Sequence, residues 1–134
     1  MRANVSIIGT WVLKSFVAEF DDGSTLQPYG DNPQGRIVYA GDGFMSAHLW
    51  NPDTHVEGTN SRAYPSYFSY CGDWSIEGEV VRHRVHASTE ASWAGQDKLR
   101  TMASIGELLE LTAEEVVFGG KEGRGILVWE RLKN

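Results

Sequence analysis

The two ends of the chain constrain its fold more than any other feature, because each carries a β-rich apolar run with a matching aromatic motif. The first run opens with Gly9-Thr10-Trp11, and the last run, residues 127–132, contains Trp129 and Arg131. A Gly-x-Trp at the start of the first strand, answered by an aromatic residue and an arginine in the last, indicates a closed β-barrel. A small closed barrel holds either a packed core or one small ligand, so the sequence predicts a container.

Turn residues divide the rest of the chain into short runs. The sequence has 15 glycines and 4 prolines and no long segment with helical periodicity, which favours an all-β sandwich or barrel. We expect strands at residues 11–20, with a bulge near Phe16-Val17, and at 36–39, 44–50, 67–76, 80–88, 97–104, 107–112 and 125–132, with a strand fragment at 114–118. These are about eight strands joined mostly by short turns, as in an antiparallel up-and-down barrel, in a single domain over residues 1–134. The longest break, residues 51–66, is long enough to form a lid.

The composition argues against several functional classes. A net charge of −6, with lysines and arginines scattered along the chain, argues against a nucleic-acid partner. No run approaches the ~20 apolar residues of a membrane-spanning helix, and the N-terminal residues carry no apolar leader, so we expect no membrane partner and a cytoplasmic location. The single cysteine, Cys71, cannot form a disulfide within the chain. The sequence leaves the oligomeric state open.

The sequence also carries no motif for a cofactor. It has no phosphate-binding loop, no dinucleotide-binding glycine pattern and no nucleophile elbow. His83 and His86 are three residues apart, so on a strand they point to opposite faces and cannot share a metal ion. We therefore expect neither a cofactor nor a metal site.

The alternation of side chains in two neighbouring runs predicts the interior of the barrel. The inner face of the run 67–76 is expected to carry Phe68, Tyr70, Gly72, Trp74 and Ile76. The inner face of the run 80–88 is expected to carry Val81, His83, Val85 and Ala87. The first set offers aromatic rings, a hydroxyl group and, at Gly72, space for a ligand. The alternative is that these rings only fill a small barrel.

His83 is the one polar residue on its interior face. A buried imidazole needs a hydrogen-bond partner and tends to stay neutral, and Tyr70 on the preceding strand is the candidate partner. Because histidine titrates near neutrality, His83 could contact a ligand or act as a general acid or base. The alternative is a core histidine whose hydrogen bonds are satisfied.

Arg100 is the best cationic candidate, but its orientation is ambiguous. If Arg100 and Met102 face inward, Arg100 would anchor a carboxylate or enolate of a ligand through its planar set of donors. If Leu99 and Thr101 face inward, Arg100 is a surface charge, and the sequence slightly favours this second arrangement. The inward face of the run 44–50 is ambiguous in the same way.

Three further aromatic residues belong to the candidate ligand site. Tyr39 and Trp129 are expected to face inward from their strands, and Trp93 is expected to line the mouth of the barrel from a loop. Trp11 and Arg131 are interpreted as structural, because an arginine packed across the tryptophan ring would plug one end of the barrel. The full set of predicted ligand contacts is Tyr39, Phe68, Tyr70, Trp74, His83, Trp93, Arg100 and Trp129.

Several segments match one family, in the order in which that family has them. They are Gly9-Thr10-Trp11-Val12-Leu13, Pro28-Tyr29-Gly30, Gly35-Arg36-Ile37-Val38-Tyr39, Asp42-Gly43-Phe44-Met45-Ser46-Ala47, Tyr67-Phe68-Ser69-Tyr70-Cys71-Gly72-Asp73-Trp74, His83-Arg84-Val85, Trp93-Ala94-Gly95 and Leu127-Val128-Trp129-Glu130-Arg131-Leu132. In these segments the chain resembles the bacterial and fungal lipocalin-like domain family, which is distinct from the secreted classical lipocalins. The resemblance implies a calycin-like β-barrel with an internal cavity. It implies little about activity, because this architecture serves both carriers and cofactor-independent enzymes.

Three functional hypotheses follow. The first is a domain that binds a small hydrophobic or aromatic metabolite inside the barrel, with Tyr70 and His83 as polar contacts. The second is a cofactor-independent isomerase, cyclase or lyase acting on a hydrophobic metabolite. In it, His83 moves a proton, Tyr70 donates a hydrogen bond and Arg100 stabilises negative charge. The third is a structural or partner-binding domain with a filled barrel. A cavity below about 100 Å³ would contradict the first two, since ligand pockets usually reach ~300 Å³ or more.

Overall fold

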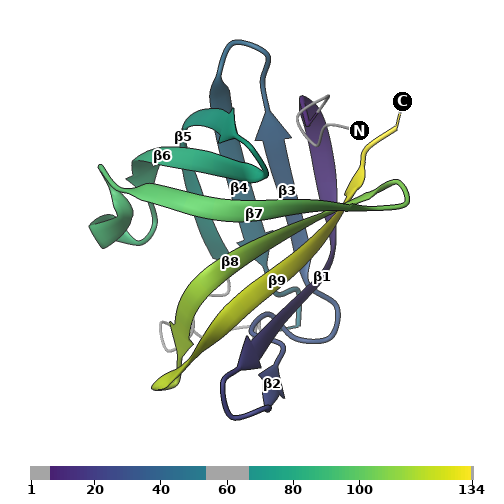
Figure 1. Ribbon diagram of the computed structural model, residues 1–134, viewed down its shortest axis with the longest axis vertical. Helices are drawn as coiled ribbons and strands as arrows, with labels where there is room; N and C mark the ends of the chain where they lie inside the picture. The colour runs from purple at the N-terminus through teal and green to yellow at the C-terminus, as the bar shows by residue number, and fades with distance from the viewer. Residues whose placement is uncertain (1–6, 54–66, 134) are drawn as a thin grey trace.

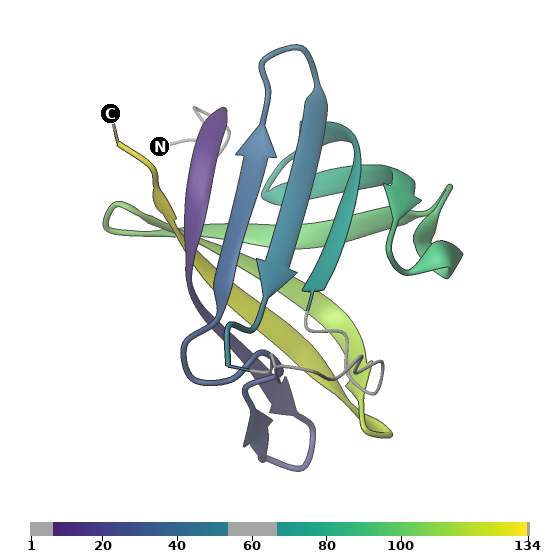
Figure 2. The same ribbon diagram turned by 180° about the vertical axis from the view of Figure 1, so that it is seen from behind.

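One antiparallel sheet curls into a barrel in the computed structural model, which describes residues 7–53 and 67–133 (Figures 1 and 2). The elements, in chain order, are β1 (Gly9–Phe20), β2 (Thr25–Leu26), β3 (Gln34–Tyr39), β4 (Phe44–Trp50), β5 (Tyr67–Glu77), β6 (Val80–Ser88), the short 3-10 helix η2 (Ala91–Trp93), β7 (Asp97–Ile105), β8 (Leu108–Phe118) and β9 (Lys121–Arg131). The loop 51–66, expected as a lid, lies outside the described residues from position 54 onward.

The barrel closes where the first long strand meets the last. Strand β1 pairs with β9 from Trp11 opposite Arg131 to Phe20 opposite Gly123, and it also pairs with β3 through its first residues. The strands β3 to β9 follow one another in sequence order around the sheet, and β2 is a short extra strand on β1. The predicted all-β, eight-stranded antiparallel barrel is therefore confirmed.

Three bulges reset which side chains face inward. In β1 the register shifts between Leu13 and Ser15, a little earlier than expected. In β8 it shifts between Ala113 and Val116, so the runs predicted separately at 107–112 and 114–118 form one strand. In β6 the extra residue is His86, which turns Ala87 outward. The expectation that Ala87 faces the interior was wrong, because simple alternation does not survive a bulge.

The first and last long strands meet at a contact between Trp11 and Arg131. The guanidinium carbon of Arg131 lies 4.3 Å from the centre of the Trp11 ring, as predicted. The Trp11 indole N–H donates to the carbonyl of Ile7 at 2.9 Å, and Arg131 Nη1 donates to the carbonyl of Ile8 at 2.6 Å. An arginine over an indole stabilises by about 0.5–2 kcal/mol, depending on how dry the contact is.

The inner and outer faces of the sheet are now distinguishable on every strand. On β4, Met45, Ala47 and Leu49 are buried in the core, which resolves the ambiguity of that run. His48 points outward instead, where its Nδ1 lies 2.7 Å from the hydroxyl of Tyr67.

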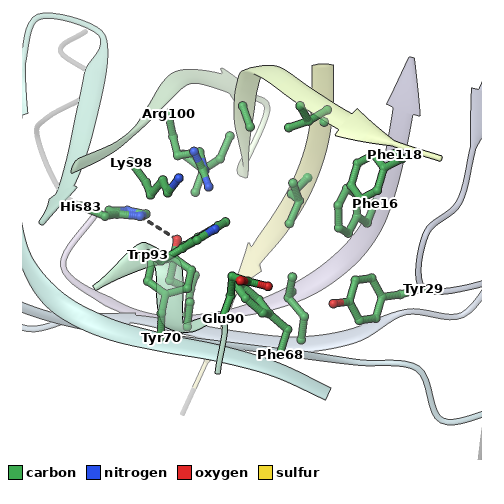
Figure 3. A pocket seen from close by; sticks show the side chains of 18 of the residues that line it. Phe16, Tyr29, Phe68, Tyr70, His83, Glu90, Trp93, Lys98, Arg100 and Phe118 are labelled. Carbon is green, nitrogen blue, oxygen red and sulfur yellow. Dashed lines mark hydrogen bonds between the residues drawn. The ribbon is translucent and has the colours of Figure 1, made fainter. Parts of the chain in front are cut away.

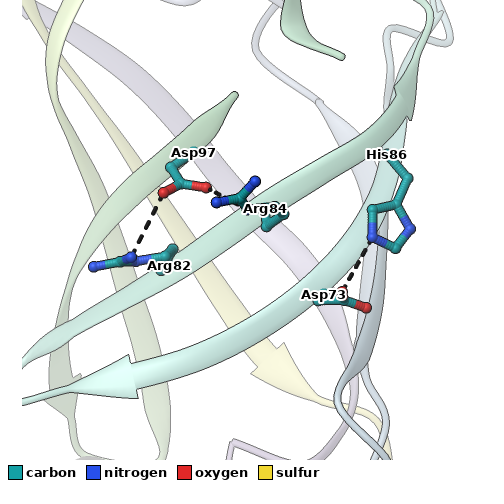
Figure 4. A network of polar contacts seen from close by, with 5 residues as sticks. All are labelled: Asp73, Arg82, Arg84, His86 and Asp97. Atoms are coloured by element: carbon teal, nitrogen blue, oxygen red, sulfur yellow. Dashed lines mark hydrogen bonds and ion pairs between the residues drawn. The ribbon is translucent and has the colours of Figure 1, made fainter. Parts of the chain in front are cut away.

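On the outer face of β5, β6 and β7, charged side chains pair with one another (Figure 4). Asp97 lies 3.5 Å from Arg82 and 3.1 Å from Arg84, and Asp73 lies 3.1 Å from His86. Such exposed pairs contribute only about 0–1 kcal/mol each.

Among the described residues, no helix is long and apolar enough to cross a membrane.

Candidate functional site

A cavity of about 480 Å³ lies inside the barrel, and neither Trp11 nor Arg131 lines it. Its walls come from all eight long strands, β1 and β3 to β9, together with the loop before β3 and η2, and most of the lining side chains are apolar or aromatic. Volumes of ~300–1,000 Å³ with a predominantly apolar lining are typical of small-molecule sites. The barrel is therefore not filled by its own side chains.

The cavity reaches the place where two neighbouring strands separate. Strand β7 pairs with β8 only from Thr101 to Ile105, so its first residues and the last part of β8 make no ladder with each other. Figure 1 shows the two strands diverging there. Lys98 and Arg100 on one side, and Val116 on the other, line the cavity along this divergence.

One end of the cavity is aromatic. The rings of Phe16 and Tyr29 stack with their centres 5.7 Å apart, and the ring of Phe118 meets that of Phe16 edge-on at 6.3 Å. Burial raises the pKa of Tyr29 above its ordinary value, so its hydroxyl stays neutral at pH 7. Figure 3 shows this group well apart from the polar groups of the cavity.

The other end contains a buried chain of three hydrogen-bonding side chains. The hydroxyl of Tyr39 lies 2.7 Å from His83 Nε2, and the hydroxyl of Tyr70, the predicted partner, lies 2.8 Å from His83 Nδ1. His83 is 1% exposed, and burial, with a smaller effect from the charge of Arg100, lowers its pKa to about 3. The imidazole is therefore neutral at pH 7, with both nitrogens engaged by tyrosines.

The two tyrosines that are hydrogen-bonded to His83 also stay protonated near neutrality. Burial raises the pKa of Tyr39 well above its ordinary value. Burial raises the pKa of Tyr70 as well, and the charge and hydrogen bonding of Arg100 oppose that rise.

Arg100 faces the cavity, so the slightly favoured expectation of a surface charge was wrong. In the ladder between β6 and β7, Arg100 lies opposite Val81 and Lys98 lies opposite His83. Directly paired residues share a face of the sheet, and both of these β6 partners are fully buried in the interior. Leu99, which alternates with them, is 51% exposed.

Trp93 lines the cavity from the short helix η2. Its ring packs against those of Phe68 and Tyr70, with centres 5.0 and 5.2 Å away. Lys98 Nζ lies 4.2 Å from the centre of the same ring. The single turn η2 thus holds an aromatic surface beside the two cations of β7.

The family model of the lipocalin-like domain matches residues 8–132, which is nearly the whole chain. This chain belongs to the lipocalin-like domain family. None of the curated proteins compared with it is similar enough in sequence to count as a relative. The lipocalin-like barrel, with its internal cavity, supports a ligand-binding domain of the calycin type.

Within this lipocalin-like domain, most of the predicted contact residues come together. Phe68, Tyr70, His83, Trp93, Arg100 and Trp129 all line the cavity. Tyr39 and Trp74 do not line it. Tyr39 reaches it only through His83, and Trp74 packs on Tyr39, with ring centres 5.3 Å apart, and donates its N–H to the carbonyl of Ala40.

Gly72 has a different role from the expected one. A Cβ at this position would overlap the carbonyl oxygen of Arg84, so the glycine permits the close approach of β5 and β6 rather than leaving room for a ligand.

The predicted contacts did not include several other residues that line the cavity, among them Phe16, Tyr29, Lys98 and Phe118. Lys98 could have been found, because a residue two positions from Arg100 on a strand shares its face. Phe16 was hidden by the misplaced bulge. Tyr29 lies in a loop, where no alternation operates.

Proposed function

We propose that this domain binds a small hydrophobic or aromatic metabolite inside its barrel. The observation that carries the proposal is the cavity of about 480 Å³, which is lined mostly with apolar and aromatic side chains. Such a space, with a few polar groups at one end, is the usual form of a small-molecule site. The third hypothesis required a barrel filled by its own side chains, and the cavity argues against that requirement.

Fluorescence titration with N-phenyl-1-naphthylamine, a neutral aromatic probe, tests this proposal. Wild-type protein should bind one probe per chain. Ala113→Phe, which places a ring in the cavity, should weaken binding at least about tenfold, since losing ~1.4 kcal/mol of contact already does so. Ala103→Phe is the matched control, because Ala103 is exposed on β7. A folded wild type that binds no probe, or equal binding by all three proteins, would contradict the proposal.

One observation favours a second candidate, a cofactor-independent isomerase, cyclase or lyase. The Tyr70 hydroxyl, supported by His83 and close to Arg100, is placed to donate to a developing oxyanion in the cavity. His83 suits a direct role as acid or base less well, because it has a strongly lowered pKa and both ring nitrogens occupied. In this second candidate Tyr70 is therefore the catalytic residue and His83 positions it.

Comparison of the compounds that copurify with wild type and with Tyr70→Phe separates the two candidates. A carrier retains the same compound in both proteins, by mass and by chromatographic retention. An enzyme that needs the hydroxyl retains product in the wild type and unreacted substrate in the variant. Identical compounds would rule out the enzyme.

A further inference from the structure

Two cations on the cavity wall lack a carboxylate partner in the described part of the chain. Lys98 and Arg100 project from the same face of β7, and neither has a carboxylate oxygen within 4.0 Å among residues 7–53 and 67–133. By contrast, the basic side chains paired within that distance all lie on the outer surface; they are Lys14, Arg82, Arg84, Lys121, Arg124 and Lys133. The protein therefore concentrates uncompensated positive charge at one end of its cavity, although its net charge is −6.

The two carboxylates that line the cavity do not neutralise this charge directly. Glu90 accepts a hydrogen bond from the Ser92 hydroxyl at 3.0 Å, and both Glu90 and Glu115 are exposed at the rim. Partial burial and the charge of Arg100 lower the pKa of Lys98. An anion bound between the two side chains would relieve their repulsion.

A count of donors in the buried chain indicates which way its hydrogen bonds run. Among the described residues, the Tyr39 hydroxyl has no partner other than His83 Nε2. If Nε2 carried the proton, the hydrogen of Tyr39 would be buried without an acceptor, at a cost of about 1–3 kcal/mol. Tyr39 therefore donates to Nε2, and His83 donates through Nδ1–H to the oxygen of Tyr70.

This direction leaves the hydrogen of Tyr70 available to the cavity. Its oxygen already accepts from His83, and Arg100, whose Nη1 donates to the carbonyl of Leu99 at 2.9 Å, acts on the same hydroxyl by opposing the rise in its pKa that burial causes. The polar end of the cavity thus presents three donors, the Tyr70 hydroxyl, the Lys98 ammonium and the Arg100 guanidinium. Figure 3 shows these groups at one end and the rings of Phe16 and Phe118 at the other.

We propose that the ligand is an amphipathic anion whose carboxylate or enolate oxygen binds to Arg100, Lys98 and the hydroxyl of Tyr70, while its apolar body lies against Phe16 and Phe118. A planar guanidinium fork matches a carboxylate in two parallel hydrogen bonds, and charge-assisted bonds are roughly twice as strong as neutral ones. This proposal rests on the proposed function, because it needs a cavity that binds a ligand at all.

Displacement of N-phenyl-1-naphthylamine by 2-naphthoate and by 2-naphthalenemethanol tests the inference. The two competitors share their ring system, and only the first is an anion at pH 7. Wild type should prefer the anion at least about tenfold, as expected for one charge-assisted hydrogen bond of ~1.5–3 kcal/mol. Arg100→Gln should abolish that preference, and Lys98→Gln should reduce the preference; direct titration with the neutral probe reports whether each variant still binds in the cavity.

Arg36→Gln is the matched control, since Arg36 is an exposed arginine on β3 and its loss changes the net charge equally. It should keep the full preference for the anion. Equal displacement by the two competitors, with the neutral probe still bound, would overturn the anion site and leave the proposed function standing. Absence of binding by the probe and by both naphthalene compounds would instead refute the proposed function.

Discussion

Tyr39→Phe removes a single buried oxygen atom, and the structure indicates what that costs. The Tyr39 hydroxyl is fully buried, lies 2.7 Å from His83 Nε2 and does not border the cavity. Without it, Nε2 becomes a buried acceptor with no hydrogen-bond partner among the described residues. The free energy of unfolding should fall by about 1–3 kcal/mol, the penalty for an unsatisfied buried polar group. That is a large share of the ~5–15 kcal/mol that stabilises a typical domain.

Urea unfolding at pH 7, followed by tryptophan fluorescence, measures this loss. The chain offers a matched control in Tyr67→Phe, because the Tyr67 hydroxyl lies at the same 2.7 Å from a histidine nitrogen, His48 Nδ1, but on the surface. Tyr67 is 46% exposed, so water replaces the lost group and the change should stay within about 0.5 kcal/mol. Equal effects of the two substitutions would refute the claim that the buried hydrogen bond between Tyr39 and His83 stabilises the fold more than the exposed one.

Three further predictions follow from the same interior. Nitrogen NMR should find His83 in the Nδ1–H form from pH 5 to pH 8 without titration. An Nε2–H form would contradict the inferred direction of the hydrogen bonds from Tyr39 through His83 to Tyr70. Because burial lowers the pKa of His83 from 6.5 to about 3, the unfolded state takes up a proton between these pH values and the folded state does not. The free energy of unfolding should therefore fall on acidification through that window, by up to about 1.4 kcal/mol per pH unit. His83→Leu should lack this component, and equal slopes for the two proteins would refute it. Gly72→Ala should lose about 2–4 kcal/mol, because its Cβ meets the carbonyl oxygen of Arg84, whereas Gly41→Ala, with its nearest atom at 4.0 Å, should lose less than ~0.5 kcal/mol, both measured by urea unfolding.

The barrel and much of its interior could be predicted from local patterns. In β5, aromatic and small or polar residues alternate regularly enough to identify the buried face, and the inward orientation of His83 followed in the same way on β6. The contact between Trp11 and Arg131 could also be predicted, because both residues lie in recognisable runs.

The orientation of Arg100 could not be predicted, because it depends on a pairing between strands. Apolar residues occur on both faces of β7, with Leu99 outside and Met102 inside, so its own sequence does not select a face. The register with β6 makes that choice. The role of Tyr39 escaped for a similar reason, since its bond to His83 joins residues 44 positions apart.

Native mass spectrometry of the protein purified from its own source tests the central claim, a ligand inside the barrel, most directly. We predict one small molecule held non-covalently per chain, released on collisional activation, and absent from Ala113→Phe because that side chain occupies the cavity. A wild type that carries no small molecule, or a compound that Ala113→Phe retains to the same extent, would contradict the account.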